Sequence, residues 1–256
     1  MLLFPNRSNI LQVAISPDGQ HIISGGQDNS IKIWNLETGK LERSIEYDPN
    51  KATYSNTIYS LVISPNGQQI ISGGWDGNFK IWNLETGKLE RIIKSHSKAV
   101  SDIAISPDGQ RIVSGSLGDK NNSIEVWNLA MEKLEHKLEG HSGSAFRFSI
   151  SPNGKYIISG SSDNSIKIWN LETGKLERTL VGHSDTIWSV AISPDEKYII
   201  SGSADKSIKI WNLETGKLER TLVGHSEMVQ SVAISPDGQY IVSGGRDNDI
   251  RLWWLE

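Results

Sequence analysis

Serine, histidine and aspartate recur together in this chain, and these three residue types can form the catalytic triad of a hydrolase. One set consists of His183, Ser201 and Asp205, and it is followed by Trp211. The same four residues recur 42 residues earlier and 42 residues later, as His141, Ser159, Asp163 and Trp169, and as His225, Ser243, Asp247 and Trp253. A triad is needed once per active site, whereas this set is complete three times in succession. We therefore interpret the set as structural and expect no catalytic residue.

The repetition extends over the whole chain, and a fixed repeat length dictates the architecture. Each repeat contains a serine–proline step at a turn and a tryptophan that closes a strand: Trp34, Trp82, Trp127, Trp169, Trp211 and Trp253. Successive tryptophans are 48, 45, 42, 42 and 42 residues apart, so two repeats carry insertions of six and three residues. We place the six repeats at about 5–45, 46–93, 94–138, 139–180, 181–222 and 223–256 plus 1–4.

Each repeat has the pattern of four short strands. In the fifth repeat we predict strands at 188–192, 198–202, 207–211 and 217–222, which are rich in Val, Ile, Trp and Tyr and bounded by Gly, Pro, Asn and Asp. The inner strands are apolar on both faces, so neighbouring sheets must cover both. The fourth strand is mostly charged, as expected of an exposed outer edge. The pattern predicts an all-β, six-bladed propeller of four-stranded antiparallel sheets.

The two ends of the chain complement each other. The last repeat stops at Glu256, before a fourth strand, and Met1–Phe4 align with Arg220–Val223 of the fifth repeat. We predict that the N-terminal residues complete the last sheet and close one domain spanning 1–256, because an open ring would expose apolar faces to water. The alternative is that these residues are frayed and the chain is a fragment.

Composition limits the classes of function. The chain has 37% apolar residues, nine tryptophans and a net charge of −4, so we expect a folded domain and no nucleic-acid partner. It has no cysteine, which excludes disulfides, thiolate catalysis and cysteine-based zinc sites. No signal peptide or membrane span is apparent near the N-terminus, so we expect a cytoplasmic protein with no membrane partner. We also expect no metal and no cofactor.

The motif that carries these features is Gly-His, an SPDG turn, SGSxD, and a strand ending in tryptophan. Over essentially the whole chain it resembles the WD40-repeat β-propeller family, and its near-verbatim copies are similar to bacterial WD-repeat arrays. Five repeats read Trp-Asn where the family commonly has Trp-Asp, and the family most often has seven blades, whereas we count six. The resemblance implies that tryptophan, serine, histidine and aspartate of each complete set form one hydrogen-bonded network.

The network is predicted to be incomplete in the first three repeats. Asn6 and Tyr54 occupy the histidine position in the first two, and the third keeps His96 but has Asp119 or Asn121 at the acid position. The third repeat also has Glu132 where four others have glycine. If that glycine has a positive φ, we expect Glu132 to require a different turn.

Two positions differ most among the otherwise similar repeats. The first, five residues after the histidine position, holds Leu11, Tyr59, Ser101, Phe146, Trp188 and Gln230; the second, just before the aspartate, holds Gln27, Trp75, Lys120, Ser162, Ala204 and Arg246. The resemblance implies that both line the channel mouth, where peptide ligands commonly lie. Arg147 adds a positive group beside Phe146. We predict a partner-binding surface of Leu11, Tyr59, Trp75, Phe146, Arg147, Trp188, Gln230 and Arg246, because aromatic and Arg residues dominate binding hot spots. The alternative is sequence drift.

These observations favour a non-catalytic scaffold that binds a protein or peptide at the channel mouth and is itself a monomer. One alternative is an enzyme with its site in the central channel, which would need carboxylates or histidines pointing into that channel. Another is a structural or oligomerising module of a larger assembly.

Overall fold

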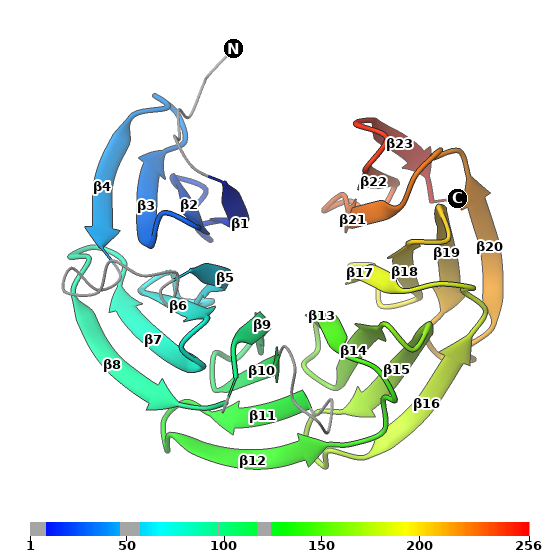
Figure 1. The fold of residues 1–256 in the computed structure, drawn as a ribbon, viewed down its shortest axis with the longest axis horizontal. Helices are drawn as coiled ribbons and strands as arrows, with labels where there is room; N and C mark the ends of the chain where they lie inside the picture. The colour runs from blue at the N-terminus through cyan, green and yellow to red at the C-terminus, as the bar shows by residue number, and fades with distance from the viewer. Residues whose placement is uncertain (1–8, 47–56, 97, 117–123, 256) are drawn as a thin grey trace. The chain divides into compact units, whose positions relative to one another are not determined.

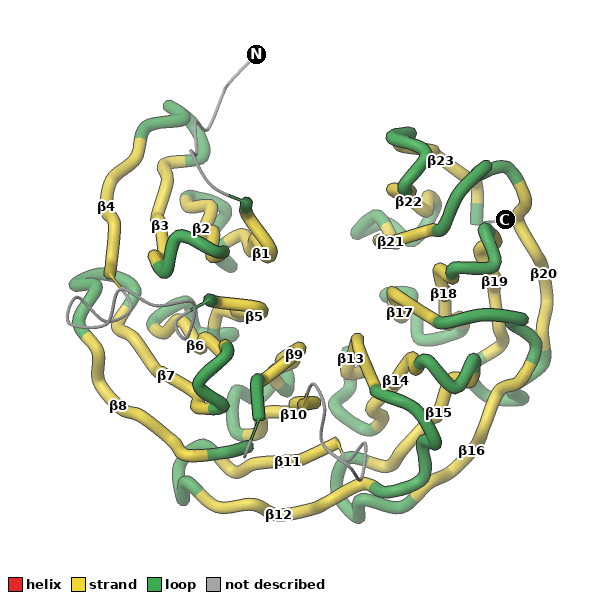
Figure 2. The backbone as a smooth tube through the Cα atoms, viewed as in Figure 1, coloured by secondary structure: helices red, strands yellow, loops and turns green. Residues whose placement is uncertain are grey.

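The computed structural model describes residues 9–46, 57–96, 98–116 and 124–255. Its described residues form 23 β-strands that run through the chain without an intervening helix (Figures 1 and 2). The chain divides into two compact units, the first consisting of 1–119 and 129–132 and the second of 120–128 and 133–256. The all-β prediction is confirmed.

The first unit holds the first two sheets and two strands of the third. Its strands are β1 (Ile10–Ile15), β2 (His21–Gly26), β3 (Ser30–Asn35), β4 (Leu41–Glu46), β5 (Ile58–Ile63), β6 (Gln69–Gly74), β7 (Asn78–Asn83), β8 (Leu89–Lys94), β9 (Val100–Ile105) and β10 (Arg111–Ser116).

The second unit holds the remaining strands. They are β11 (Ile124–Asn128), β12 (Lys133–Leu138), β13 (Ala145–Ile150), β14 (Tyr156–Ser161), β15 (Ser165–Asn170), β16 (Leu176–Val181), β17 (Ile187–Ile192), β18 (Tyr198–Ser203), β19 (Ser207–Asn212), β20 (Leu218–Val223), β21 (Val229–Ile234), β22 (Tyr240–Gly245) and β23 (Ile250–Trp254).

Strands that follow one another in the chain lie next to one another in each sheet. Five sheets have four strands, and the sixth has β21, β22 and β23 among the described residues. The ends of the observed strands of the fifth repeat lie within one residue of the predicted ends. Met1–Phe4, proposed above as the closing strand, lie outside the described residues, so ring closure stays a prediction.

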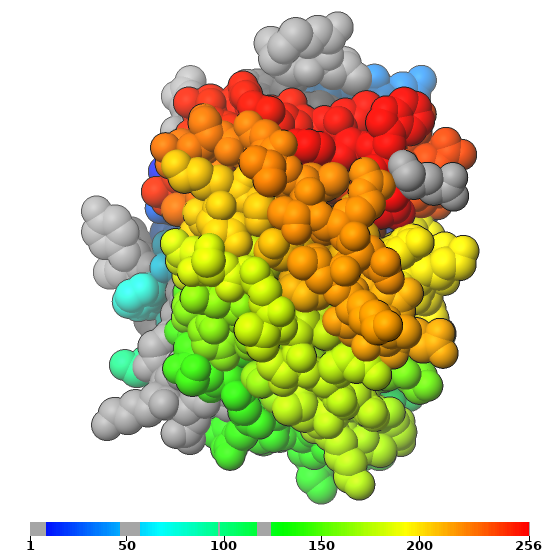
Figure 3. All heavy atoms as spheres, turned by 90° about the vertical axis from the view of Figure 1, so that its right-hand side faces the viewer, coloured from blue at the N-terminus to red at the C-terminus, as the bar shows by residue number. Residues whose placement is uncertain are grey.

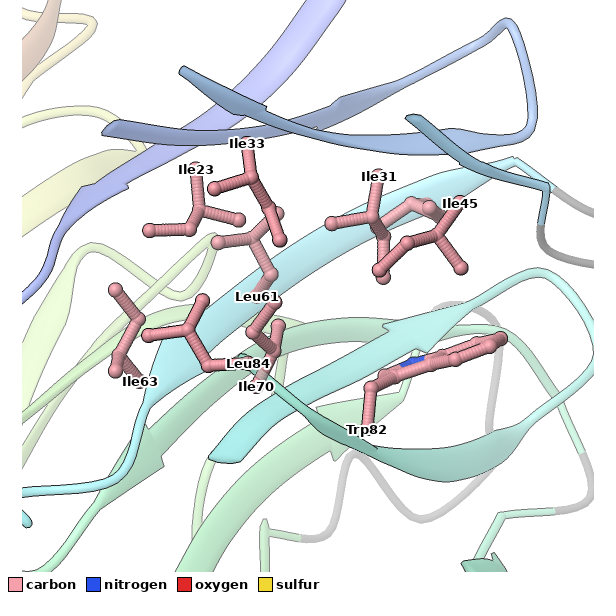
Figure 4. Packing of buried hydrophobic residues seen from close by; sticks show 10 residues of the cluster. Ile23, Ile31, Ile33, Ile45, Leu61, Ile63, Ile70, Trp82 and Leu84 are labelled. Atoms are coloured by element: carbon pink, nitrogen blue, oxygen red, sulfur yellow. The ribbon is translucent and has the colours of Figure 1, made fainter. Parts of the chain in front are cut away.

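Neighbouring sheets within each unit cover each other's apolar faces. In the first unit, Ile23 and Ile33 of the first sheet belong to the same buried cluster as Leu61 and Trp82 of the second (Figure 4). The glycine of the SGS motif permits this approach, because a Cβ on Gly202 would lie only 2.8 Å from Cγ1 of Val229 in the next sheet. The glycine of the motif therefore allows neighbouring sheets to pack closely, in addition to lying near the end of a strand.

The fourth strands are charged and exposed, as predicted. In Figure 3, β20 (orange) and β16 (yellow-green) run across the visible face of the second unit. The arginine on such a strand also donates to backbone carbonyls that follow the third strand of the next sheet. Arg178 Nη1 donates to Leu213 O at 3.2 Å and to Glu214 O at 2.6 Å, and Arg220 Nη1 donates to Leu255 O at 2.9 Å.

This bond from an outer-strand side chain to a carbonyl of the next sheet, which we call the clasp, recurs elsewhere in both units. In the first unit Arg43 Nη1 donates to Leu84 O at 3.2 Å, and Arg91 Nη1 donates to Leu129 O at 3.0 Å. In the second unit His136 takes the place of the arginine, with Nε2 lying 2.9 Å from Glu172 O. These bonds join successive sheets at their outer edges.

The expectation that Glu132 requires a different turn is wrong. Its φ is 52°, close to the 69° of Gly39 and the 72° of Gly216, so it adopts the same left-handed conformation. Such a backbone is unfavourable for a residue with a Cβ. The Glu132 carboxylate lies 3.3 Å from Nη1 of Arg91, so the side chain adds an ion pair between the two sheets.

Each unit also presents an exposed apolar sheet face. In the first unit Val13 and Ile15 of β1 are 57% and 61% exposed. In the second unit Ile250 and Leu252 of β23 are 82% and 63% exposed. Faces of this kind are energetically unfavourable in water unless another surface covers them.

The clasp makes a prediction for Gly216, whose φ is +72° and whose added Cβ would overlap Cδ of Arg178. Gly216→Ala should lower the free energy of unfolding by more than the about 1–2 kcal/mol expected from the left-handed backbone alone. The matched control is Gly238→Ala, because Gly238 also has φ +72° but its Cβ would meet nothing closer than Pro194 Cδ at 3.8 Å. Urea denaturation would measure both variants. Equal losses would contradict the proposed crowding.

Candidate functional site

The four residues of the fifth repeat form one buried hydrogen-bonded network. Trp211 Nε1 donates to Ser201 Oγ at 2.9 Å, and Ser201 Oγ lies 2.7 Å from His183 Nε2. His183 Nδ1 lies 2.7 Å from Asp205 Oδ2, which also accepts the Ser184 backbone N–H at 3.1 Å. The network therefore ties the loop before β17 to the β18–β19 turn and gives the buried indole N–H an acceptor.

The electrostatics of the network follow from its burial. Burial lowers the pKa of His183 and keeps the imidazole neutral. Burial opposes ionisation of Asp205, but hydrogen bonds from Ser207 and His183 outweigh it and lower the pKa of this carboxyl to about 2. The consistent arrangement is a neutral His183 whose Nδ1–H donates to the Asp205 carboxylate and whose Nε2 accepts the Ser201 hydroxyl proton.

The fourth and sixth sheets have the same arrangement. His141 lies 2.8 Å from both Ser159 Oγ and Asp163 Oδ2, and Trp169 Nε1 donates to Ser159 at 2.9 Å. In the sixth sheet the distances from His225 to Ser243 and Asp247 are both 2.8 Å, and Trp253 donates to Ser243 at 2.8 Å. The His141, His183 and His225 side chains are at most 1% exposed, so no substrate in solvent can reach them.

The first two sheets retain the tryptophan–serine bond of this arrangement, and the predicted incompleteness of the network in the first three repeats stays a prediction. Trp34 and Trp82 still donate to Ser24 at 3.0 Å and Ser72 at 2.9 Å. The aspartates of these sheets pair with lysine, with Asp76 Oδ2 lying 3.0 Å from Lys80 Nζ and Asp28 bonded to Lys32. The residues at their histidine positions, Asn6 and Tyr54, lie outside the described residues.

In the third sheet, His96 Nε2 lies 2.7 Å from Ser114 Oγ. Trp127 Nε1 donates to Glu125 Oε2 at 2.9 Å, and Glu125 occupies the position that is lysine in four other repeats. Asp119, Lys120 and Asn121 lie outside the described residues, so the acid of this repeat is not assigned.

The first variable position coincides with a β-bulge in every sheet. In the fifth sheet Ile187 pairs with Ser203 and Ser189 pairs with Gly202, which leaves Trp188 as the extra residue. The same irregularity falls at Leu11, Tyr59, Ser101, Phe146 and Gln230. A bulge bends the strand and re-aims the side chain of its extra residue. These positions are therefore outside the regular ladder and less constrained by the packing between sheets.

The second variable position is fixed beside the first by a backbone hydrogen bond. Ala204 N donates to Thr186 O at 2.8 Å, and Arg246 N donates to Met228 O at 2.9 Å. Equivalent bonds link Gln27 to Asn9, Trp75 to Thr57 and Ser162 to Ser144. Five sheets therefore present a pair of adjacent display positions, one on the bulge and one on the β2–β3-type turn, while Lys120 of the third sheet lies outside the described residues.

In the first unit the display pair of the second sheet is aromatic. The ring centroids of Tyr59 and Trp75 are 6.3 Å apart, and the planes are inclined by 45°. Trp75 is 55% exposed, and partial burial raises the pKa of Tyr59, so this phenol is neutral and can donate a hydrogen bond. Leu11 of the first sheet is partly buried and belongs to the pair with Gln27.

In the second unit the bulge residues of two sheets meet. Phe146 and Trp188 stack with centroids 4.8 Å apart and planes inclined by 16°. Both rings are partly exposed, and their partner positions hold the small residues Ser162 and Ala204. Trp188 Nε1 is buried and has no hydrogen-bond partner within the described residues. Gln230 and Arg246 form an exposed polar pair in the sixth sheet, and Arg147 beside Phe146 is partly buried.

Sequence reasoning missed the role of the residue after the bulge. Ser60 Oγ accepts a hydrogen bond from Ile103 N at 3.1 Å, and Ser189 Oγ accepts one from Val232 N at 3.1 Å. Both serines are buried and join the first strands of neighbouring sheets within their units. Their recurrence beside variable positions was the available signal, but it did not reveal an intersheet bond.

The first prediction from the network concerns Ser201, whose hydroxyl contacts both Trp211 and His183. Ser201→Ala leaves two buried polar groups without this partner and should lower the free energy of unfolding by about 1–3 kcal/mol. Ser184→Ala is the control, because Ser184 is exposed and joins the network through its backbone N–H. Urea denaturation followed by tryptophan fluorescence measures both. A similar small effect of the two substitutions would argue against the network's stabilising role.

The second prediction concerns pH. The unfolded chain binds more protons wherever the folded pKa is depressed, so stability must fall on acidification. The lowered pKa of His183 predicts a loss as the pH decreases below its ordinary value of 6.5. Asp205, with a pKa of about 2 against an ordinary 3.8, predicts a further loss as the pH falls through that interval. Denaturation midpoints measured over this range test both, and Asp205→Asn should reduce the second loss. A midpoint that rises on acidification would refute the assignment.

Comparison with known proteins agrees with this geometry. The family model described as "WD domain, G-beta repeat" matches residues 3–35, 49–83, 87–128, 132–170, 174–212 and 216–253. A segment of 47 residues, 18% of this chain, is 34% identical to the WD40 repeat-containing protein smu1 of Dictyostelium discoideum, and it spans 9% of that protein. Because the family model matches most of the chain in six successive copies, the chain belongs to the WD40 repeat family of β-propellers.

Proposed function

We propose that this chain is a non-catalytic interaction platform that binds a protein or peptide through its display positions. WD40 propellers generally mediate protein interactions and are typically non-enzymatic. The observation that carries the proposal is the pairing of bulge and turn residues, because it holds variable side chains on a rigid framework. Such preorganisation reduces the entropy lost on binding.

The second unit offers the best-developed part of the surface. The Phe146–Trp188 stack gives a broad apolar contact for a ligand. The exposed Arg246 adds a positive charge in the next sheet. An extended peptide with an aromatic or aliphatic side chain and a nearby acceptor fits this chemistry.

The first unit contributes a separate aromatic pair, Tyr59 and Trp75. That the display positions of both units form one continuous mouth stays a prediction, as do the monomeric state and the cytoplasmic location. The described residues include no helix long and apolar enough to cross a membrane.

The serine–histidine–aspartate sets do not support a catalytic function for this chain. Their histidine rings are at most 1% exposed, and the hydroxyls of Ser159, Ser201 and Ser243 are committed to indole and imidazole groups. A nucleophile must reach its substrate, and these cannot.

The experiment is selection of a displayed random-peptide library on the intact chain, followed by affinity measurement with the enriched peptides. Phe146→Ala and Trp188→Ala should each weaken binding by about tenfold or more, as expected for hot-spot residues. Val223→Ala is the matched control, because it removes an apolar side chain that is 78% exposed on the outer strand β20. Equal binding by the wild-type chain and both aromatic variants would refute the proposed surface, and self-association lost in the variants would favour the oligomerising alternative.

A further inference from the structure

The exposed apolar face of the sixth sheet is equivalent to a face that the fifth sheet buries. In the fifth sheet three isoleucines form this face and are at most 1% exposed: Ile200, Ile208 and Ile210. They belong to one buried cluster with Val229 and Val232 of the sixth sheet. The sixth sheet has apolar residues at the same three repeat positions, but these are 39%, 82% and 63% exposed: Val242, Ile250 and Leu252. The sixth sheet therefore retains an intersheet packing face that is open to solvent.

A glycine in this face forms a gap. The equivalent residue of the fifth sheet is Gly202, where a Cβ would lie 2.8 Å from Val229 Cγ1 and 3.0 Å from Val232 Cγ1. The same close approach to the next sheet occurs at three further glycines: Gly25, Gly73 and Gly160. At Gly244 of the sixth sheet, no atom of the described residues lies within 4 Å of the Cβ that would be added. The gap at Gly244 therefore matches those that receive two apolar side chains, three residues apart, from a first strand.

The polar groups of the face also match those of a buried interface. Ser189 of the fifth sheet is buried, and its Oγ accepts a hydrogen bond from Val232 N at 3.1 Å. Ser231 occupies the same repeat position in the sixth sheet and is exposed. A first strand packed on this face would therefore place a backbone N–H beside the Ser231 hydroxyl.

The first sheet carries the side chains that such a gap receives. Ile10 and Val13 of β1 occupy the repeat positions of Val229 and Val232, but they are 41% and 57% exposed. A groove of about 400 Å³ runs along the same face. Its lining is almost entirely apolar and includes Ile10, Val13, Ile15, Ile22 and Trp34. The first sheet therefore has both the apolar side chains that fit a glycine gap and a hollow that fits apolar side chains of another sheet.

We propose that two copies of this chain associate by packing the first sheet of one copy on the sixth sheet of the other. Ile10 and Val13 of one copy fill the gap at the partner's Gly244, and Val13 N donates to the partner's Ser231 Oγ. The partner's Val242, Ile250 and Leu252 enter the groove. A second copy is the occupant because it carries, at the required spacing, the residue types that fill the equivalent gaps between successive sheets of the chain.

This interface uses a different face of each copy, so it is heterologous, and repetition of the contact gives either a closed ring of copies or a longer array. Pairing of the same two faces within one copy is the competing arrangement, and it gives a monomer. The proposal favours the oligomerising alternative over the monomer expected from the sequence. It is independent of the proposed peptide site, because Phe146 and Trp188 lie on neither face.

Sedimentation velocity of the wild-type chain over a series of concentrations should show species of at least twice the mass of the chain. Gly244→Thr should weaken this association by about tenfold or more, because it overpacks the gap. The same substitution should leave the unfolding transition unchanged, because the added Cβ meets no atom of the described residues in the single chain. Val223→Thr is the control, because Val223 is 78% exposed on β20 and lies on neither face, and it should retain the association.

A mixing experiment tests the use of two different faces. Gly244→Thr blocks the sixth-sheet face, Val13→Lys blocks the first-sheet face, and each variant keeps the other face intact. Each variant alone should be monomeric at concentrations where the wild-type chain associates. A mixture of the two variants should form a dimer through the two intact faces.

Disulfide formation distinguishes pairing between copies from pairing within one copy, because the chain has no cysteine of its own. The Cβ added at Gly25 lies 3.4 Å from Ile58 Cβ, close to the separation of about 3.5–4.5 Å in disulfides, and Gly244 and Ile10 are the equivalent pair. On oxidation, a mixture of Ile10→Cys and Gly244→Cys chains should give a linked dimer of the two variants, and the chain with both cysteines should give linked oligomers. An internally linked monomer of the double variant, a wild-type chain that is monomeric at every concentration, or unchanged association of both Gly244→Thr and Val13→Lys would each overturn the proposal.

Discussion

The structure depends on one constraint, which is that every sheet is apolar on both faces and must be covered by its neighbours. The contacts that achieve this coverage include those of the first strand of one sheet with the second and third strands of another, where Ile58 and Leu61 belong to one buried cluster with Ile23 and Ile33. Close approach requires a residue without a Cβ at the end of the second strand, as Gly202 illustrates against Val229. A single repeat could not satisfy this constraint, so stability is shared between adjacent repeats.

The polar interactions are arranged around that packing and do not replace it. Inside each complete repeat, the serine hydroxyl accepts the indole N–H, so a tryptophan can be buried without an unsatisfied donor. Between repeats, serines such as Ser189 join the first strands and arginines such as Arg220 clasp the outer edge. Variation is then tolerated where none of these bonds is made, which is at the bulge and at the adjoining turn. Binding positions and scaffold positions are separated for this physical reason.

Much of the fold could be predicted from the sequence, because a strand assigned in one repeat can be checked against the aligned segments of the other repeats. The predicted strands of the fifth repeat match the observed ones to within one residue, and composition alone predicts the charged outer strand. The bulge at Trp188 could not be predicted, because two strands of equal apparent length give no sign that one carries an extra residue. The turn at Glu132 differs from its prediction, because a residue with a Cβ is disfavoured at positive φ and nothing in the local sequence indicates that Glu132 adopts it. The candidate display residues were found as variable positions, but their pairing through backbone hydrogen bonds required coordinates.

The lysine of the third strand shows how differences among repeats can be coupled. In the complete fourth and fifth repeats, Lys167 and Lys209 donate to Thr179 and Thr221 on the fourth strand, at 2.9 Å and 3.1 Å. In the first two repeats the threonine position holds Ser44 and Ile92, and the lysine forms an ion pair with the aspartate. The histidine and the threonine that accepts from the lysine are therefore both present in the fourth and fifth repeats and both absent from the first two.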